Sequence, residues 1–235
     1  MCAASVAIVG AGIAGLACAK ELQTAGLSVQ VFEKSRGLGG RSATRFASLS
    51  KFDHGAQFFT ARSKNFLDWV DAGLQMGLIA SWQPRLRYER EAPQWYVGVP
   101  GMSSLARVFQ LDELVQREAL VLQIERIETP GQMPWRLTYE KNQQLQVATF
   151  DFVILAIPGP QAAQLLQKSI ANQPTLDGAL TALLQKLSCK TMLPCWAIWF
   201  ETNRDLLGDT KYDVWQIPED LENNQIRWIA KNNSK

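Results

Sequence analysis

Residues 5–33 read SVAIVGAGIAGLACAKELQTAGLSVQVFE, and this stretch decides the fold. Its first five residues are rich in β-branched side chains, as a buried parallel strand requires. A helical pattern follows from residue 16 to residue 25, and a second strand pattern ends at Glu33. A strand, a helix and a second strand in this order predict a βαβ unit with parallel strands.

Three glycines in the spacing GxGxxG join the first strand to the helix: Gly10, Gly12 and Gly15. In a βαβ unit they allow a tight turn, a close approach of the backbone to a pyrophosphate, and close packing of helix on strand. The helix amino terminus offers N–H groups and a partial positive charge to phosphates. Glu33 is placed to accept hydrogen bonds from a ribose diol, and its charge disfavours the 2′-phosphate of NADP. The unit therefore predicts a site for FAD or NAD.

A second glycine-rich loop, KSRGLGGRSATR at residues 34–45, follows the second strand directly. Gly39 and Gly40 free the backbone to bend against a ligand. The guanidinium groups of Arg36 and Arg41 suit phosphate oxygens. An NAD domain has no need of a second phosphate-binding loop here, whereas an FAD molecule spread across the sheet does. The loop therefore favours FAD over NAD.

Together with the βαβ unit, several further motifs resemble the FAD-dependent amine oxidoreductases, and within that superfamily the renalase-like bacterial proteins. They are RGLGGR at 36–41, FDHGAQFFT at 52–60, YVGVPGMSSL at 96–105 and FDFVILAIPGPQA at 150–162. The amino-terminal motifs indicate only FAD binding, whereas GAQFFT and PGM narrow the choice to renalase-like proteins. The resemblance extends along nearly the whole chain.

The resemblance implies which residues hold FAD. The first glycine turn and Glu33 would hold the ADP half, and the second loop would contact the pyrophosphate and the ribityl chain. Residues 56–58 would line the flavin ring largely through backbone groups, and the main chain of Val121 would pair with adenine. The full predicted set is Gly10, Gly12, Ile13, Ala14, Gly15, Glu33, Lys34, Arg36, Gly39, Gly40, Arg41, Ala56, Gln57, Phe58, Val121, Ala156 and Pro158.

The same resemblance implies a reaction. The substrate would be an isomeric dihydronicotinamide dinucleotide that transfers a hydride to flavin N5, and dioxygen would reoxidise the flavin. An amine is the alternative substrate. Because this hydride transfer needs no general base, the sequence identifies no catalytic residue. His54 is the only histidine and lies in the loop predicted near the flavin, and Asp53 beside it is expected to fix that loop by an Asx-type hydrogen bond.

The predicted fold class is α/β, with a Rossmann-like FAD-binding domain of the glutathione reductase and amine oxidase type. This domain would comprise 1–64 and 97–160, and an inserted α+β substrate domain would comprise 65–96 and 161–235. Renalase-like chains continue well beyond the last residue here, so the resemblance predicts a substrate domain that is incomplete at its carboxy terminus. An alternative of another class is therefore a non-catalytic dinucleotide-binding protein.

Alternating apolar residues predict strands at 195–200, 212–217 and 225–230 in the second domain. Leucines at helical spacing predict a helix over 176–187, and a short helix at 102–110 is expected to be capped by Ser103 or Ser104. Four of the eight tryptophans lie in the predicted strands. They favour either an aromatic-lined pocket for a flat substrate or an ordinary packed core.

Charge and composition exclude several other classes of protein. The chain has 24 Lys and Arg residues against 22 Asp and Glu, which is too near neutral for a general nucleic-acid-binding protein. Its four cysteines form no CxxC pair and have no metal-ligand spacing to the histidine, so no metal site is predicted. Apart from the first glycine-rich region, no apolar run approaches the length of a membrane span. The sequence predicts a cytoplasmic protein whose partners are small molecules.

Overall fold

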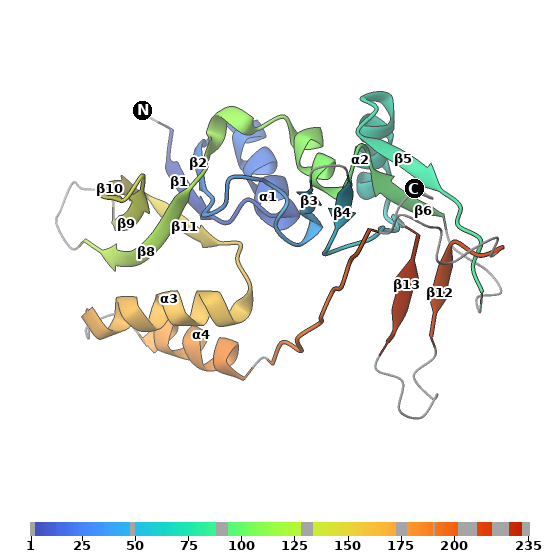
Figure 1. Ribbon diagram of the computed structural model, residues 1–235. Helices are drawn as coiled ribbons and strands as arrows, with labels where there is room; N and C mark the ends of the chain where they lie inside the picture. Colours follow the sequence, from blue (N-terminus) through green and yellow to red (C-terminus); the bar gives the residue numbers. More distant parts are fainter. Residues whose placement is uncertain are drawn as a thin grey trace. The chain divides into compact units, whose positions relative to one another are not determined.

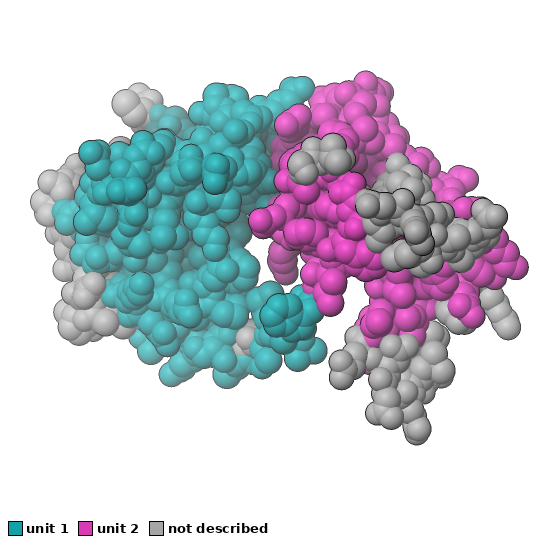
Figure 2. All heavy atoms as spheres, viewed as in Figure 1, with its two compact units in different colours: residues 1–40, 109–196 teal, residues 41–108, 197–235 magenta. Residues whose placement is uncertain are grey.

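The computed structural model describes residues 3–47, 50–87, 94–127, 134–172, 178–189, 191–201, 211–217 and 226–231. Backbone contacts divide the chain into two compact units, coloured separately in Figure 2. Unit 1 comprises 1–40 and 109–196, and unit 2 comprises 41–108 and 197–235. These units are defined by packing, so the functional domains expected from the sequence stay a prediction.

A four-stranded parallel sheet forms the centre of unit 1 (Figure 1). Helix α1 (Ile13–Thr24) joins β1 to β2 and buries Leu16 and Ala19. Strand β1 pairs in parallel with β2 on one side and with β11 on the other. The order of the sheet is β11 (Phe152–Leu155), β1 (Ser5–Val9), β2 (Ser28–Phe32) and β7 (Val115–Gln116). The predicted βαβ unit and the α/β fold class are therefore confirmed.

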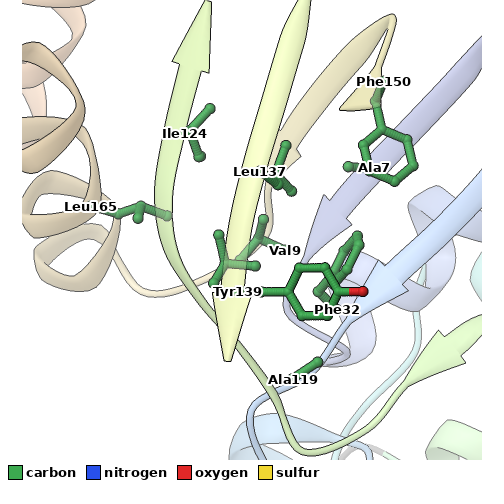
Figure 3. Close-up of a cluster of buried hydrophobic side chains, with 10 residues drawn as sticks. Ala7, Val9, Phe32, Ala119, Ile124, Leu137, Tyr139, Phe150 and Leu165 are labelled. Atoms are coloured by element: carbon green, nitrogen blue, oxygen red, sulfur yellow. The ribbon is translucent and has the colours of Figure 1, made fainter. Parts of the chain in front are cut away.

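An antiparallel meander packs on one face of this sheet. It consists of β8 (Ala119–Arg126), β9 (Trp135–Lys141) and β10 (Gln144–Phe150), in the order β10-β9-β8. Figure 3 shows the cluster of buried side chains between the two layers. The Phe32 ring meets the edges of Tyr139 and Phe150, with ring centroids 4.9 and 5.8 Å apart. Such edge-to-face pairs add to the burial of apolar area, so this cluster fixes the meander on the sheet.

Two helices complete unit 1. Helix α3 (Gly159–Asn172) follows β11 and packs on β8, where Leu165 joins the buried cluster (Figures 1 and 3). Helix α4 (Gly178–Ser188) packs on α3. Helix α4 lies close to the helix that leucine spacing predicts over 176–187. Among the described residues, no helix is long and apolar enough to span a membrane.

Unit 2 contains three two-stranded antiparallel ribbons among its described residues: β3 with β4, β5 with β6, and β12 with β13. Short helices connect or flank the ribbons. The elements between residues 40 and 230 that lie outside the sheets of unit 1, α3 and α4 are η1 (Gly40–Ser42), β3 (Thr44–Phe46), β4 (Lys51–Asp53), α2 (Lys64–Gln75), β5 (Ile79–Trp82), β6 (Trp95–Gly98), η2 (Met102–Phe109), η3 (Asp112–Leu114), β12 (Val214–Gln216) and β13 (Trp228–Ala230). Of these, η3 belongs to unit 1, and η1 and η2 each span a boundary between the units in the sequence. Because an isolated two-stranded ribbon is marginally stable in water, each ribbon depends on side-chain packing.

An aromatic cluster joins two of these ribbons to the loop at residue 58. Phe58 stacks on Trp95 with ring centroids 3.8 Å apart and on Trp228 at 5.4 Å. Trp82 lies 5.5 Å from Trp95, which is almost fully buried. This packing agrees with the core alternative for Trp228, one of the four tryptophans in the predicted strands.

The strand predicted at 195–200 is wrong. These residues are extended but form no ladder with any strand that the structure describes. Trp196 is 92% exposed, whereas Trp199 stacks on Phe52 of β4 with centroids 4.9 Å apart. Alternation of apolar residues indicates which side chains would share a face of a strand, but a strand also requires a neighbouring backbone that supplies hydrogen bonds.

An ion pair joins Asp213, the residue before β12, to Arg85 in the segment that follows β5. The Arg85 guanidinium donates to both oxygens of Asp213, at 2.9 Å from Nε and 2.7 Å from Nη2. The Arg85 backbone N–H donates to the same carboxylate at 3.0 Å, and the Asp213 N–H donates to the Arg85 carbonyl at 2.9 Å. The hydrogen bonds from Arg85 lower the pKa of Asp213 to about 2.

This lowered pKa predicts how stability changes with pH. In the unfolded chain Asp213 has a pKa near 3.8, so its contribution is complete above about pH 4 and is lost as pH falls toward 2. Because Arg85 is 61% exposed, solvent screening reduces this contribution to about 1 kcal/mol. The free energies of unfolding in urea of wild type and Asp213→Asn should differ by that amount at pH 6 and converge toward pH 2.

Asp68→Asn, at a surface pair with Lys64, is the control, and its free energy of unfolding should change little. A difference for Asp213→Asn that does not depend on pH would contradict the assignment.

Candidate functional site

The turn after β1 requires glycine at two positions because of the protein's own backbone conformation and packing. Gly10 has φ of +107°, and a Cβ on it would lie 2.7 Å from the carbonyl oxygen of Ala156. A Cβ on Gly15 would lie 2.0 Å from the carbonyl oxygen of Gly10. Ala156 is held in place by its own N–H, which donates to the Val9 carbonyl at 2.8 Å. The tight turn and the close helix packing expected of these glycines are therefore present.

Gly12 has no such packing reason to be glycine. Its φ of −72° is available to any residue, and the nearest atom to an added Cβ is the Gly40 Cα at 4.0 Å. Gly12 is also the N-cap of α1, which has no side-chain cap and no acidic residue in its first turn. The helix amino terminus therefore presents N–H groups beside open space, which is the arrangement that binds an anion.

The second glycine-rich loop packs on the first, backbone to backbone. The Gly39 N–H donates to the Ala11 carbonyl at 2.9 Å, and Gly39 forms a parallel bridge with Gly12. Gly40 has φ of +55°, and a Cβ on it would lie 3.2 Å from the Gly12 Cα. Small residues are required where two backbones approach this closely. The structure thus brings the predicted glycines of both loops together within unit 1.

Glu33 links the end of β2 to the first turn. Its side chain is buried, with Oε2 accepting from the Ala11 N–H at 2.9 Å and Oε1 accepting from the Ser35 N–H at 2.8 Å. Each carboxylate oxygen has more than one lone-pair site, so the group can also accept hydrogen bonds from a ribose. The sequence analysis missed this bracing role. The sequence signal for this role is the position of Glu33 at the carboxyl end of a strand, beside the glycine-rich turn.

The other predicted residues of unit 1 surround this turn or lie farther along the sheet. Ile13 and Ala14 occupy the first turn of α1, and the Pro158 carbonyl accepts from the N–H of Ala162 in the first turn of α3. Val121 is buried in β8, opposite Tyr139 of β9.

The charged residues of the second loop extend into solvent. Lys34 is exposed, and the Arg36 side chain is 90% exposed with its Nε 3.8 Å from Glu118 Oε1. A surface ion pair of this kind contributes little to stability. Arg36 can therefore exchange this partner for a phosphate at low cost.

The remaining predicted residues form a second group, in unit 2. The Ala56 N–H donates to the Arg41 carbonyl at 2.9 Å, and a Cβ on Gly55 would lie 2.0 Å from that oxygen. The Gln57 side chain donates to the Asp53 carbonyl. Phe58 belongs to the aromatic cluster described above. The structure therefore fixes the backbone of this loop against residue 41.

The Asp53 side chain accepts hydrogen bonds from residues farther away in the sequence than the predicted Asx-type bond would reach. Its Oδ1 accepts from the Thr44 hydroxyl at 2.7 Å and from the Met102 N–H at 2.9 Å. The Thr44 hydroxyl in turn accepts from the Ser103 N–H at 3.0 Å. Asp53 and Thr44 therefore supply the caps of η2, and the expected capping by Ser103 or Ser104 is wrong. His54, beside Asp53, is exposed.

Comparison with known proteins agrees with this fold. Residues 8–72 match the family of NAD(P)-binding Rossmann-like domains. The chain is also similar to the crystal structure of a protein described as a protoporphyrinogen oxidase, from Exiguobacterium sp. 255-15, with a TM-score of 0.51 and 16% sequence identity. The similarity covers 71% of this chain and 62% of that one. At this identity it shows a shared fold, and the chain spans less than two thirds of the length of that relative.

The contrast between Gly10 and Gly12 gives a testable prediction for stability. Gly10→Ala should cost more than about 2 kcal/mol, because it adds a clash with Ala156 to a backbone conformation that L residues rarely adopt. Gly12→Ala should change the free energy of unfolding by about 0.5 kcal/mol or less. Denaturant unfolding measures both. Equal destabilisation by the two changes would show that Gly12 is also required for packing.

Proposed function

We propose that this chain binds FAD and is part of a flavin-dependent oxidoreductase of the amine-oxidase type. The observation that carries the proposal is the open space at Gly12, beside an uncapped helix amino terminus and the carboxylate of Glu33. A protein without a ligand there would gain stability from a capping side chain at this position. An anionic ligand supplies the missing partner instead.

The residues present fit the ADP half of FAD. The N–H groups of the first turn of α1 would bind the diphosphate, and Glu33 would accept hydrogen bonds from the adenosine ribose. The second loop supports FAD over NAD, because its glycines face Gly12 and its arginines Arg36 and Arg41 add positive charge. The similarity to a protein described as a protoporphyrinogen oxidase agrees with a flavoprotein fold.

The chain's own role in the reaction would be binding and orientation. Bound FAD supplies the hydride acceptor, flavin N5. The loop at residues 55–58 is held against Arg41 by a backbone hydrogen bond and a close backbone contact, so it is pre-organised to position a ring through its main-chain groups. A dihydronicotinamide dinucleotide is the proposed substrate, dioxygen the proposed acceptor, and an amine the alternative substrate.

Flavin content and reduction test the proposal. Purified protein should absorb at the flavin maxima or become yellow on reconstitution with FAD, and NAD should bind more weakly. Anaerobic addition of a dihydronicotinamide should bleach the flavin, and admission of oxygen should restore the colour with release of hydrogen peroxide. Bound FAD that neither a dihydronicotinamide nor an amine reduces would select the non-catalytic alternative. Protein that cannot bind FAD would overturn the proposal.

A Gly12→Val side chain would occupy the proposed diphosphate path. We expect FAD affinity to fall more than tenfold, because the backbone could no longer approach the phosphates. Gly178→Ala, at an open glycine position of α4, is the matched control and should retain wild-type affinity. Equilibrium titration of folded proteins with FAD measures the effect. Wild-type affinity in folded Gly12→Val protein would contradict the phosphate assignment.

Glu33→Ala should weaken FAD binding by about 1.5–3 kcal/mol, because the ribose loses a charged acceptor. It should also lower the free energy of unfolding, because the buried Ala11 N–H and the Ser35 N–H lose their partner. Titration with FAD under conditions where the variant is folded separates the two effects. Glu21→Ala, on the exposed side of α1, is the control. Unchanged affinity in Glu33→Ala would mean that the ribose lies elsewhere.

A further inference from the structure

An apolar cavity lies within unit 1, between the sheets and the two helices α3 and α4. Its volume is about 430 Å³, and its walls come from β8, β9, β11, α3 and α4. Trp135 of β9, Leu155 of β11 and Ala162 of α3 all line it, together with three leucines of α4. None of the glycines of the first turn or second loop lines it. Ile157, which does line it, would lie 2.8 Å from a Cβ on Gly10, so the cavity adjoins the first turn but has its own set of lining residues.

The walls of this cavity define the chemistry of what can occupy it. Every lining residue is aliphatic, aromatic or glycine, and none carries a titratable side chain. A charged group placed there would lose its hydration with no counter-charge to replace it, which is strongly unfavourable. The volume falls within the range of small-molecule pockets, roughly 300–1,000 Å³. The suitable occupant is thus an uncharged hydrocarbon group.

Helix α4 presents its apolar face to the cavity. Leu180, Leu183 and Leu187 follow one another at helical spacing, and all three line it. Leu183 is still 43% exposed, so the cavity has an entrance at this helix. Side chains around such a space lack contacts that a filled core would supply. Insertion of a hydrocarbon would bury these leucines and remove apolar surface from water.

We propose that this cavity binds the hydrocarbon ring or chain of an uncharged small molecule. The cavity walls recognise it by shape and by the exclusion of charge, and Trp135 contributes an aromatic surface to them. None of the lining residues is among those proposed to hold FAD, so occupancy of the cavity does not require the proposed function to be correct.

The neutral fluorescent probe N-phenyl-1-naphthylamine tests the proposal. We expect saturable binding with one site per chain, a blue-shifted probe emission and quenching of tryptophan fluorescence. Ala162→Phe fills the cavity from α3 and should weaken binding at least tenfold. Gln164→Phe adds the same side chain on the exposed side of α3 and should bind like wild type. FAD titration should be the same for both variants.

A second variant, Leu183→Lys, tests probe binding if Ala162→Phe fails to fold. Leu183→Lys places a charge at the entrance and should also weaken binding at least tenfold, with the helical circular dichroism retained. An anionic probe of similar shape, 1-anilinonaphthalene-8-sulfonate, should bind at least tenfold more weakly than the neutral one. Absent or non-saturable binding by wild type, or equal binding by all the variants, would overturn the proposal. A dimer that the neutral probe dissociates would also overturn it, because the occupant would then be a second copy of the chain.

Discussion

The close approach of backbones at the end of β1 is the constraint on which unit 1 depends. The Gly10 N–H donates to the Phe32 carbonyl at 2.8 Å, and the Ala156 N–H donates to the Val9 carbonyl at the same distance. The ends of β2, β1 and β11 are therefore tied together at one turn. Because no Cβ fits at Gly10, this junction leaves room for backbone alone. The parallel sheet and the candidate site share this single point of assembly.

Two kinds of glycine follow from that junction, and they have different physical meanings. Gly10 and Gly15 are small because the protein itself fills the space beside them. Gly12 is small although the protein leaves the space open. A motif match treats all three alike, whereas the structure separates the two positions that build the turn from the one beside open space. Glu33 braces the turn through the Ala11 and Ser35 N–H groups.

Local patterns predicted the βαβ segment of unit 1, because its strands and helix are adjacent in sequence and the glycine spacing marks the turn between them. The structure changes only the ends of these elements. The interactions that hold unit 2 together are different in kind. Asp53 reaches Met102 and Arg85 reaches Asp213, and neither partner is marked by periodicity. The strand expected at 195–200 failed for the same reason, since its pairing depends on residues distant in sequence.

The division of the chain between the units has a consequence for how the protein is made. Unit 1 needs 1–40 and 109–196, so a growing chain has all of its segments once residue 196 has left the ribosome. In unit 2, Trp228 packs on Phe58 and Trp95. These two side chains therefore cannot complete their aromatic cluster until residue 228 has been synthesised, later than any segment of unit 1.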